Sequence, residues 1–238
     1  MGFGHVSAES VSMRPFQPAS LIIGLIAMLL AGCQTMEMIG APGAMPRSLP
    51  AQAVNAGPRG GTDLMLPRVY LMRGLARTVS EGVDHLSVKL AARGYRASVH
   101  GYDDWQQIAN AILADHRRSG GATRAVVIGH SLGANSVVAL VNALAERNVD
   151  VDLAITFDPT VDLQVTGGVG RFINFYQSDN GWGRVIRTNA AMQGKVENID
   201  LRSMVHLTHF TIDRDVQVHQ RVLTAIEQIA ARTPAPRR

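Results

Sequence analysis

One serine stands in a context that favours chemical reactivity. Residues 125–136 read AVVIGHSLGANS, and Ser131 lies between Gly129 and Gly133 at the end of an apolar run. A strand that turns sharply into a helix needs small residues two positions before and after the serine, because the chain is crowded there. Such a turn raises the hydroxyl above the sheet and points the first helical amides toward an oxyanion. Ser131 is therefore a candidate nucleophile, and the amide of Leu132 a candidate oxyanion donor.

A serine hydroxyl is a weak nucleophile and needs a base within hydrogen-bonding distance. His130 is adjacent, but neighbours on such a turn point in different directions. His206 and His209, in MVHLTHFTID, are the candidates, and each lies in the loop expected before the last helix. Their His-x-x-His spacing lacks the glutamate or cysteine partners of a zinc motif, so we expect no metal and no cofactor.

The base in turn needs an acid that orients the imidazole and stabilises its charged form. Two aspartates follow expected strands, Asp158 in AITFDPT and Asp179 in FYQSDNGWG. Asp158 is favoured because it follows an apolar strand directly and Pro159 stiffens the turn. Asp179 lies in Ser-Asp-Asn-Gly, which is also typical of an ordinary turn, and it is the alternative acid.

The segment GHSLGA resembles the nucleophile turn of the α/β-hydrolase superfamily, in particular its lipase, esterase and thioesterase branches. The resemblance extends over residues 68–230 in the order of elements, although only this turn is a sharp motif. It implies a serine, an acid and a histidine in that chain order. It also implies a base just before the last helix, which favours His209 over His206.

The loop after the first expected strand, Arg73-Gly74-Leu75, is where a second oxyanion donor is expected. Gly74 lets the backbone approach a substrate, and the amide of Leu75 is the candidate donor. Arg73 stands where many lipases carry a histidine. Two roles are open for Arg73, binding of an anionic group and pairing with a carboxylate.

Strands and helices that alternate from Pro67 onward must position these residues. Strands are expected at 68–72, 95–100, 125–128, 153–157, 172–176 and 196–201. Helices are expected at 80–93, at 132–147 and from Asp213 or Asp215 onward. A further helix is expected to begin at a capping Asp103, with Gln106 as the partner of the cap. Residues 161–170 and 179–194 are interpreted as insertions. Apolar strands joined through helices predict an open, mostly parallel α/β sheet of about six strands with helices on both faces.

Composition narrows the classes of partner. The chain has 238 residues, of which 46% are hydrophobic, and this is enough for one sizeable core. The formal net charge of +4 is mild and the basic residues are scattered, which argues against nucleic-acid binding. One cysteine is present, so no disulfide can form within the chain.

An uncharged apolar run, residues 21–32, ends at that cysteine, Cys33. It is short for a membrane span but has the length of a signal-peptide core, with Arg14 before it. The sequence Leu-Ala-Gly-Cys at its end resembles the lipobox of bacterial lipoproteins, which implies lipid modification of Cys33. An ordinary signal peptide or an anchor helix is the alternative. In such lipoproteins an aspartate directly after the cysteine favours retention in the inner membrane. This chain has Gln34 at that position, which favours the outer membrane.

These patterns predict four regions: a signal peptide at 1–32, a proline-rich flexible tether at 33–66, a hydrolase-like domain at 67–231 and a disordered tail at 232–238. The predicted function is a serine hydrolase that cleaves a small-molecule or lipid ester, or a thioester, through an acyl-enzyme. A lipidated N-terminus would hold it to the bacterial cell envelope, facing the periplasm. An acyltransferase and a non-catalytic binding lipoprotein are the alternatives.

Overall fold

The computed structural model describes residues 66–75, 80–121 and 124–231. All of them belong to one compact unit, Gln52–Arg238. The predicted signal peptide, Cys33, the tether up to residue 65 and the tail from 232 lie outside the described residues. Within the described ranges, no helix combines the length and the apolar character that crossing a membrane requires.

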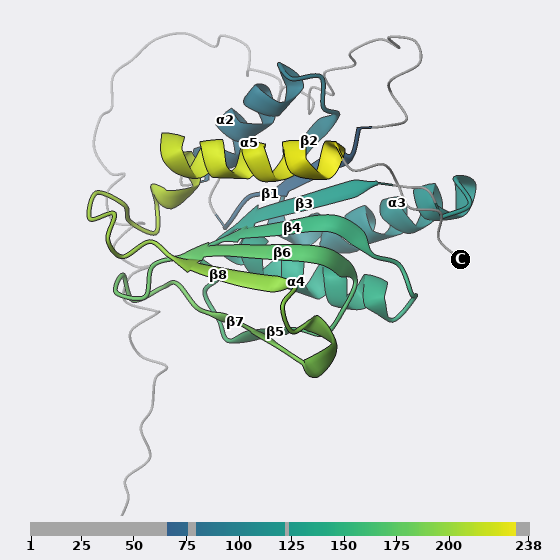
Figure 1. Ribbon diagram of the computed structural model, residues 1–238. Helices are drawn as coiled ribbons and strands as arrows, with labels where there is room; N and C mark the ends of the chain where they lie inside the picture. Colours follow the sequence, from purple (N-terminus) through teal and green to yellow (C-terminus); the bar gives the residue numbers. More distant parts are fainter. Residues whose placement is uncertain (1–65, 76–79, 122–123, 232–238) are drawn as a thin grey trace, which may run out of the picture. The chain divides into compact units, whose positions relative to one another are not determined.

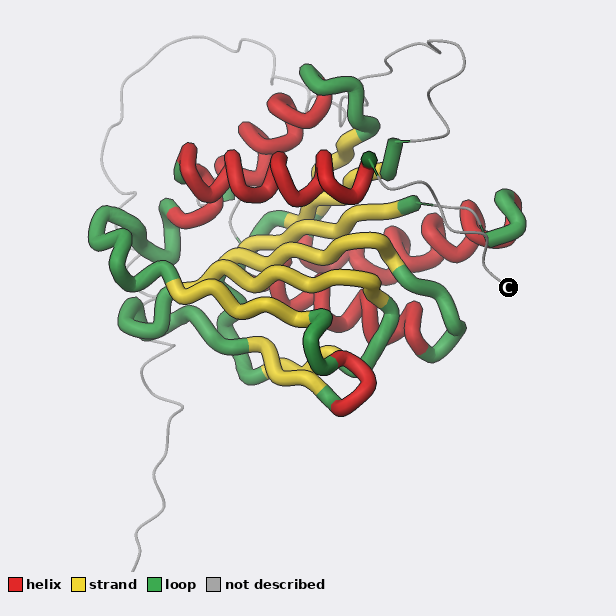
Figure 2. The backbone as a smooth tube through the Cα atoms, viewed as in Figure 1, coloured by secondary structure: helices red, strands yellow, loops and turns green. Residues whose placement is uncertain are grey.

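Six parallel strands form the central sheet, in the order β2-β1-β3-β4-β6-β8 (Figures 1 and 2). Their bounds are β1 Arg68–Met72, β2 Ala97–His100, β3 Ala125–His130, β4 Val151–Phe157, β6 Val169–Tyr176 and β8 Val196–Asp200. The predicted architecture, an open and mostly parallel α/β sheet of about six strands, is confirmed.

Helices cover both faces of this sheet (Figure 1). The helices are α2 Glu81–Ala91 and α5 Val216–Ala230 on one face, and α3 Trp105–Arg118 and α4 Leu132–Ala145 on the other. Alternate residues of one strand enter opposite cores: Val69 and Leu71 pack with α2 and α5, whereas Tyr70 and Met72 pack with α3 and α4. Burial on both faces explains why the strands read as continuous apolar runs.

The start of α3 differs from the prediction. Asp103 does not cap this helix; residues Tyr102–Asp104 form a short 3-10 turn, η2. The Asp104 carboxylate accepts a hydrogen bond from the amide of Gly101 at 2.9 Å, and this contact closes the turn. At α5 the choice between two aspartates is resolved, because Asp215 accepts hydrogen bonds from the first helical amides and Asp213 does not.

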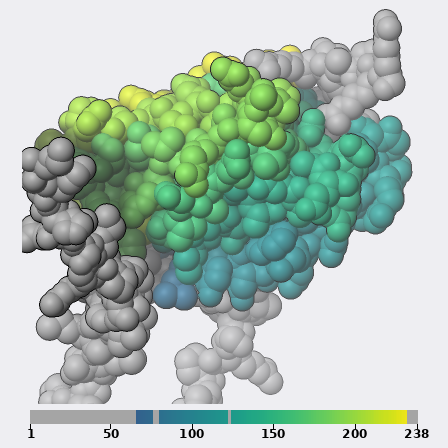
Figure 3. All heavy atoms as spheres, turned by 90° about the horizontal axis from the view of Figure 1, so that it is seen from below, coloured from purple at the N-terminus to yellow at the C-terminus, as the bar shows by residue number. Residues whose placement is uncertain are grey.

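The two insertions contain a second, two-stranded parallel sheet that the sequence does not predict, β5 Leu163–Val165 and β7 Ile186–Thr188. Side-chain amides hold it. Asn142 of α4 donates to the carbonyl of Gln164 and accepts from the amide of Thr166, both at 2.9 Å. Three-residue strands are too short for an alternating pattern to be visible in sequence. In Figure 3 the green surface of this part of the chain continues into the teal surface of the α3–α4 side.

A buried asparagine connects the main sheet to the segment before β7. Asn174 of β6 is fully buried, and its amide donates to the Arg184 carbonyl at 2.8 Å and to Asn198 Oδ1 at 2.9 Å. Its own oxygen accepts from Thr156 Oγ1 at 2.8 Å. Polar groups inside a core need such partners, so Asn174 links β4, β6 and β8 through side chains as well as backbone.

We expect Asn174→Ala to lower the free energy of unfolding by about 3 kcal/mol, because it leaves buried partners unsatisfied and creates a cavity. Urea denaturation measures this change. Asn110→Ala, at an exposed position of α3, is the control and should change stability by less than about 0.5 kcal/mol. Equal stabilities of the two variants would contradict this role of Asn174.

Candidate active site

The backbone at Ser131 has the strained geometry that the glycine spacing predicts. Ser131 follows β3 directly, with φ 57° and ψ −120°, and α4 begins at the next residue. This region of φ is rarely adopted by residues other than glycine. A Cβ on Gly129 would overlap the carbonyl of Gly133, and a Cβ on Gly133 would overlap the carbonyl of Met72. Both glycines are therefore sterically required for the turn.

The residues predicted as nucleophile, base and acid lie in one continuous hydrogen-bonded chain. Ser131 Oγ lies 3.0 Å from His209 Nε2, and His209 Nδ1 lies 3.1 Å from Asp158 Oδ2. They come from the ends of β3 and β4 and from the loop between β8 and α5, beyond the C-terminal ends of parallel strands. Asp158 is fully buried and His209 is 4% exposed, so water does not screen their interaction.

The surroundings of Asp158 determine which nitrogen of His209 carries the proton. Asp158 Oδ1 accepts from the amide of Gln177 at 2.9 Å, and Oδ2 accepts from Asn180 Nδ2. A carboxylate held by these donors accepts the Nδ1–H of His209. The lone pair of His209 Nε2 then faces the hydroxyl of Ser131, as proton abstraction requires.

The alternative residues lie elsewhere. His206 is exposed, and its Nε2 lies 3.1 Å from Asp215 Oδ2 at the start of α5. Asp179 is exposed in its turn, and within the described part of the chain it forms no hydrogen bond or ion pair with His209. In that turn it is Asn180 that reaches the site, where its Nδ2 donates to Asp158. Its side-chain oxygen accepts from the amides of Trp182 and Gly183. The sequence Ser-Asp-Asn-Gly indicates the turn but not which of its side chains points inward.

The two candidate oxyanion donors flank Ser131. Leu132 is the first residue of α4, where an amide has no partner within the helix. On the other side, a Cβ on Gly74 would lie 3.0 Å from Ser131 Cβ, so this loop approaches the serine closely. The Gly74 amide already donates to Ser80 Oγ at 2.9 Å, which leaves the amide of Leu75 as the candidate donor of this loop.

Arg73 does not face a free anion site. Its Nε donates to Asp84 Oδ2 at 2.9 Å, and a second nitrogen pairs with the other carboxylate oxygen. Of the two roles left open by the sequence, the structure shows carboxylate pairing. The arginine thereby joins the loop after β1 to α2.

Two aromatic side chains whose sequence context does not mark them as site residues border the histidine. The Trp182 ring stacks on His209 with centroids 4.9 Å apart and an interplanar angle of 22°. Phe210 packs against the same imidazole edge-on at 5.2 Å. Trp182 is 41% exposed, Phe210 46% and Leu75 69%, which makes the surface beside the site apolar.

Two titratable groups are buried behind the site. Burial, together with neighbouring His209, lowers the pKa of His130 to about 4, so its imidazole is neutral at neutral pH. Burial raises the pKa of Asp213 to about 7, against the opposing effect of the neighbouring Arg214 guanidinium. Asp213 Oδ2 lies 3.8 Å from His130 Nδ1, and neither of its carboxyl oxygens has a hydrogen-bond partner among the described residues.

The described ranges contain no group of three or more histidine, cysteine, aspartate or glutamate side chains placed to hold a metal ion.

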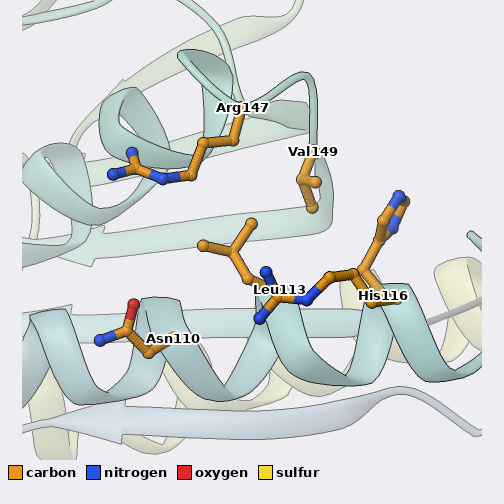
Figure 4. Close-up of a pocket in the computed structure, with 6 residues that line it drawn as sticks. Asn110, Leu113, His116, Arg147 and Val149 are labelled. Atoms are coloured by element: carbon orange, nitrogen blue, oxygen red, sulfur yellow. The ribbon is translucent and has the colours of Figure 1, made fainter.

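A cavity of about 430 Å³ lies between α3 and the end of α4 (Figure 4). Its lining residues are Asn110, Leu113, His116, Arg117, Arg147 and Val149. None of the residues of the serine site lines it.

No family model matches this chain. No curated protein matches it either. Among solved structures, it is similar to the ydeN gene product from B. subtilis, with 14% identity and a TM-score of 0.45 over 68% of this chain and 99% of that one.

The ionisation of Asp213 leads to a pH-dependent prediction. The folded carboxyl stays protonated up to about pH 7, whereas its ordinary pKa is 3.8. Between these values the folded state binds more protons than the unfolded state, so this group makes the free energy of unfolding fall as pH rises from about 4 to about 7. The difference between these two pKa values corresponds to about 4 kcal/mol.

Asparagine at position 213 cannot ionise. The free energy of unfolding of Asp213→Asn, taken relative to that of the wild type, should therefore rise by up to about 4 kcal/mol between pH 4 and pH 8. Denaturant unfolding at a series of pH values measures the difference. Asp150→Asn, at an exposed position, should follow the wild type throughout. A constant gap between Asp213→Asn and the wild type across this range would contradict the prediction.

Proposed function

We propose that this protein is a serine hydrolase that cleaves a carboxylic ester or thioester through an acyl-enzyme. The observation that carries the proposal is the unbroken chain of contacts from Ser131 Oγ through His209 to Asp158, with the serine on a strained turn at the end of a strand. A structural serine does not need that strain, which costs about 1–3 kcal/mol and persists only where the surroundings impose it.

The first half of the reaction forms the acyl-enzyme. Ser131 Oγ attacks the substrate carbonyl while its proton passes to His209 Nε2. Asp158 stabilises the imidazolium, and the amides of Leu132 and Leu75 donate to the developing oxyanion. His209 then returns the proton to the leaving oxygen or sulfur as its bond to the acyl carbon breaks.

The second half releases the acid. Water attacks the acyl carbon, and His209 takes one of its protons. The bond to Ser131 Oγ breaks, and His209 gives the proton back to that oxygen. The face of Trp182 against the imidazole also supports the charged form of His209 in both halves, because an aromatic face attracts a cation.

The substrate that this site fits best is neutral and apolar beside its carbonyl. Trp182, Phe210 and Leu75 supply exposed apolar surface next to the reacting residues. The arginine in the loop after β1, Arg73, is already paired with Asp84. Both observations support esters of apolar acids over substrates that carry a phosphate.

The assignment of the three residues can be tested with a fluorophosphonate probe and p-nitrophenyl esters of several chain lengths. Ser131→Ala should abolish labelling, and Asp158→Asn should lower kcat by about 10⁴-fold because it removes the acceptor that sets the tautomer of His209. His206→Ala and Asp179→Asn are the matched controls and should retain nearly the wild-type rate. Equal labelling of wild type and Ser131→Ala would refute the proposal.

We also propose that the domain acts while anchored to the cell envelope through lipid on Cys33. The sequence of residues 21–33 supports this, and Cys33 lies outside the described residues. Cys33→Ser should prevent acylation and move the protein from the membrane fraction to the soluble fraction, because burial of acyl chains supplies about 0.8 kcal/mol per methylene. Cell fractionation measures the shift, and a variant that stays fully membrane-bound would contradict it.

A further inference from the structure

We propose that Ser80 and His130 are positioning residues that join the loop carrying Gly74 and Leu75 to the loop carrying His209. The proposal rests on the function proposed above and extends it to residues that touch neither the substrate nor the serine hydroxyl. It gives His130, the neighbour of the nucleophile, a role different from that of a base.

Three hydrogen bonds connect the loops. The Gly74 amide donates to Ser80 Oγ at 2.9 Å, and Ser80 Oγ lies 2.9 Å from His130 Nδ1. On the far side of the ring, His130 Nε2 lies 2.7 Å from the backbone oxygen of His209. Ser80 and His130 are both fully buried, so water cannot take the place of these bonds.

The direction of every bond in this chain is determined. A carbonyl oxygen only accepts, so His130 Nε2 carries the proton that reaches His209. The low pKa of His130 keeps the ring neutral, which leaves Nδ1 as an acceptor. The Ser80 hydroxyl must then donate to Nδ1, and its oxygen is free to accept from Gly74. One tautomer and one hydroxyl orientation satisfy all three contacts.

The distance between the two connected loops must stay constant during the reaction, because each carries a group that acts on the substrate. The His209 side chain is held by Asp158, and its backbone is held by His130. The Gly74 position lies against Ser131, so movement of this loop changes the distance between the Leu75 amide and the oxyanion. A displacement of about 1 Å at a reacting group can cost about 10²-fold in rate.

The chain contains a matched comparison for a purely structural histidine. His219 of α5 is also buried, and its pKa is likewise lowered by burial to about 4. Its Nε2 donates to the backbone oxygen of Asp213 at 2.6 Å, and its Nδ1 lies 2.8 Å from Lys89 Nζ. His219 thus makes the same kinds of bond as His130, but its bonds join α5 to α2 and to the turn before α5, and neither of them involves Ser80, Gly74 or His209.

The test compares steady-state kinetics on a p-nitrophenyl ester with thermal stability for each variant of the full chain. His130→Leu should lower kcat by about 10²-fold with little change in KM, because the misplaced groups act in the transition state. His130→Gln keeps an amide donor toward His209 and should recover most of that loss. Ser80→Ala should lower kcat by about tenfold, and Ser80→Thr, which keeps the hydroxyl, should restore it.

His219→Leu is the control: it should lose stability as His130→Leu does while kcat stays near the wild-type value. Hydrogen exchange provides a readout that needs no activity, since the Gly74 amide should exchange faster in Ser80→Ala than in Ser80→Thr. Labelling of wild-type Ser131 by the fluorophosphonate tests the proposed function separately. Wild-type kcat in folded His130→Leu, equal kcat losses in His130→Leu and His219→Leu, or unchanged exchange at Gly74 would each overturn the positioning role.

Discussion

The positive φ of Ser131 is the constraint on which the rest of the site depends. With this backbone geometry the hydroxyl leaves the turn between β3 and α4 and reaches His209. It brings the chain on either side so close that Gly129 and Gly133 have no room for a side chain. The same crowding brings the loop after β1 against the serine. One local strain therefore determines where three segments of the chain meet.

Packing on both faces of the sheet supplies the stability that this strain requires. The central strands are buried between α2 and α5 on one side and α3 and α4 on the other. Polar groups inside this frame are paired, as the links from Asn174 to Thr156 and Asn198 show. Among the described residues, the buried carboxyl oxygens of Asp213 and the Nε of Arg214 lack such a partner, and Asp213 lies beside His130 at the back of the site. An unpaired buried carboxyl costs stability, and proteins accept such costs mainly at functional sites.

Much of the fold follows from local pattern. The apolar run 68–72 predicts β1 to the residue, and helical spacing predicts α2, α4 and α5 to within a few residues. The prediction is wrong where several capping groups compete over a few residues, because Asp104, not Asp103, closes the turn before α3. It also misses β5 and β7, which are three residues each and are held by the side chains of Asn142 and Asn198. Contacts of that kind join residues far apart in the chain and leave no periodic signal.

The sequence by itself determined the turn, because the steric need for Gly129 and Gly133 around Ser131 is a local one. It also narrowed the base and the acid to two candidates each, since those residues must follow strands. Only the tertiary structure placed His209 and Asp158 beside the serine and left His206 and Asp179 exposed, because that depends on how distant loops fold over the sheet edge. The same is true of Ser80, Asn180 and Trp182. Each is unremarkable in its local sequence and acquires a partner only when strands separated in the chain lie side by side.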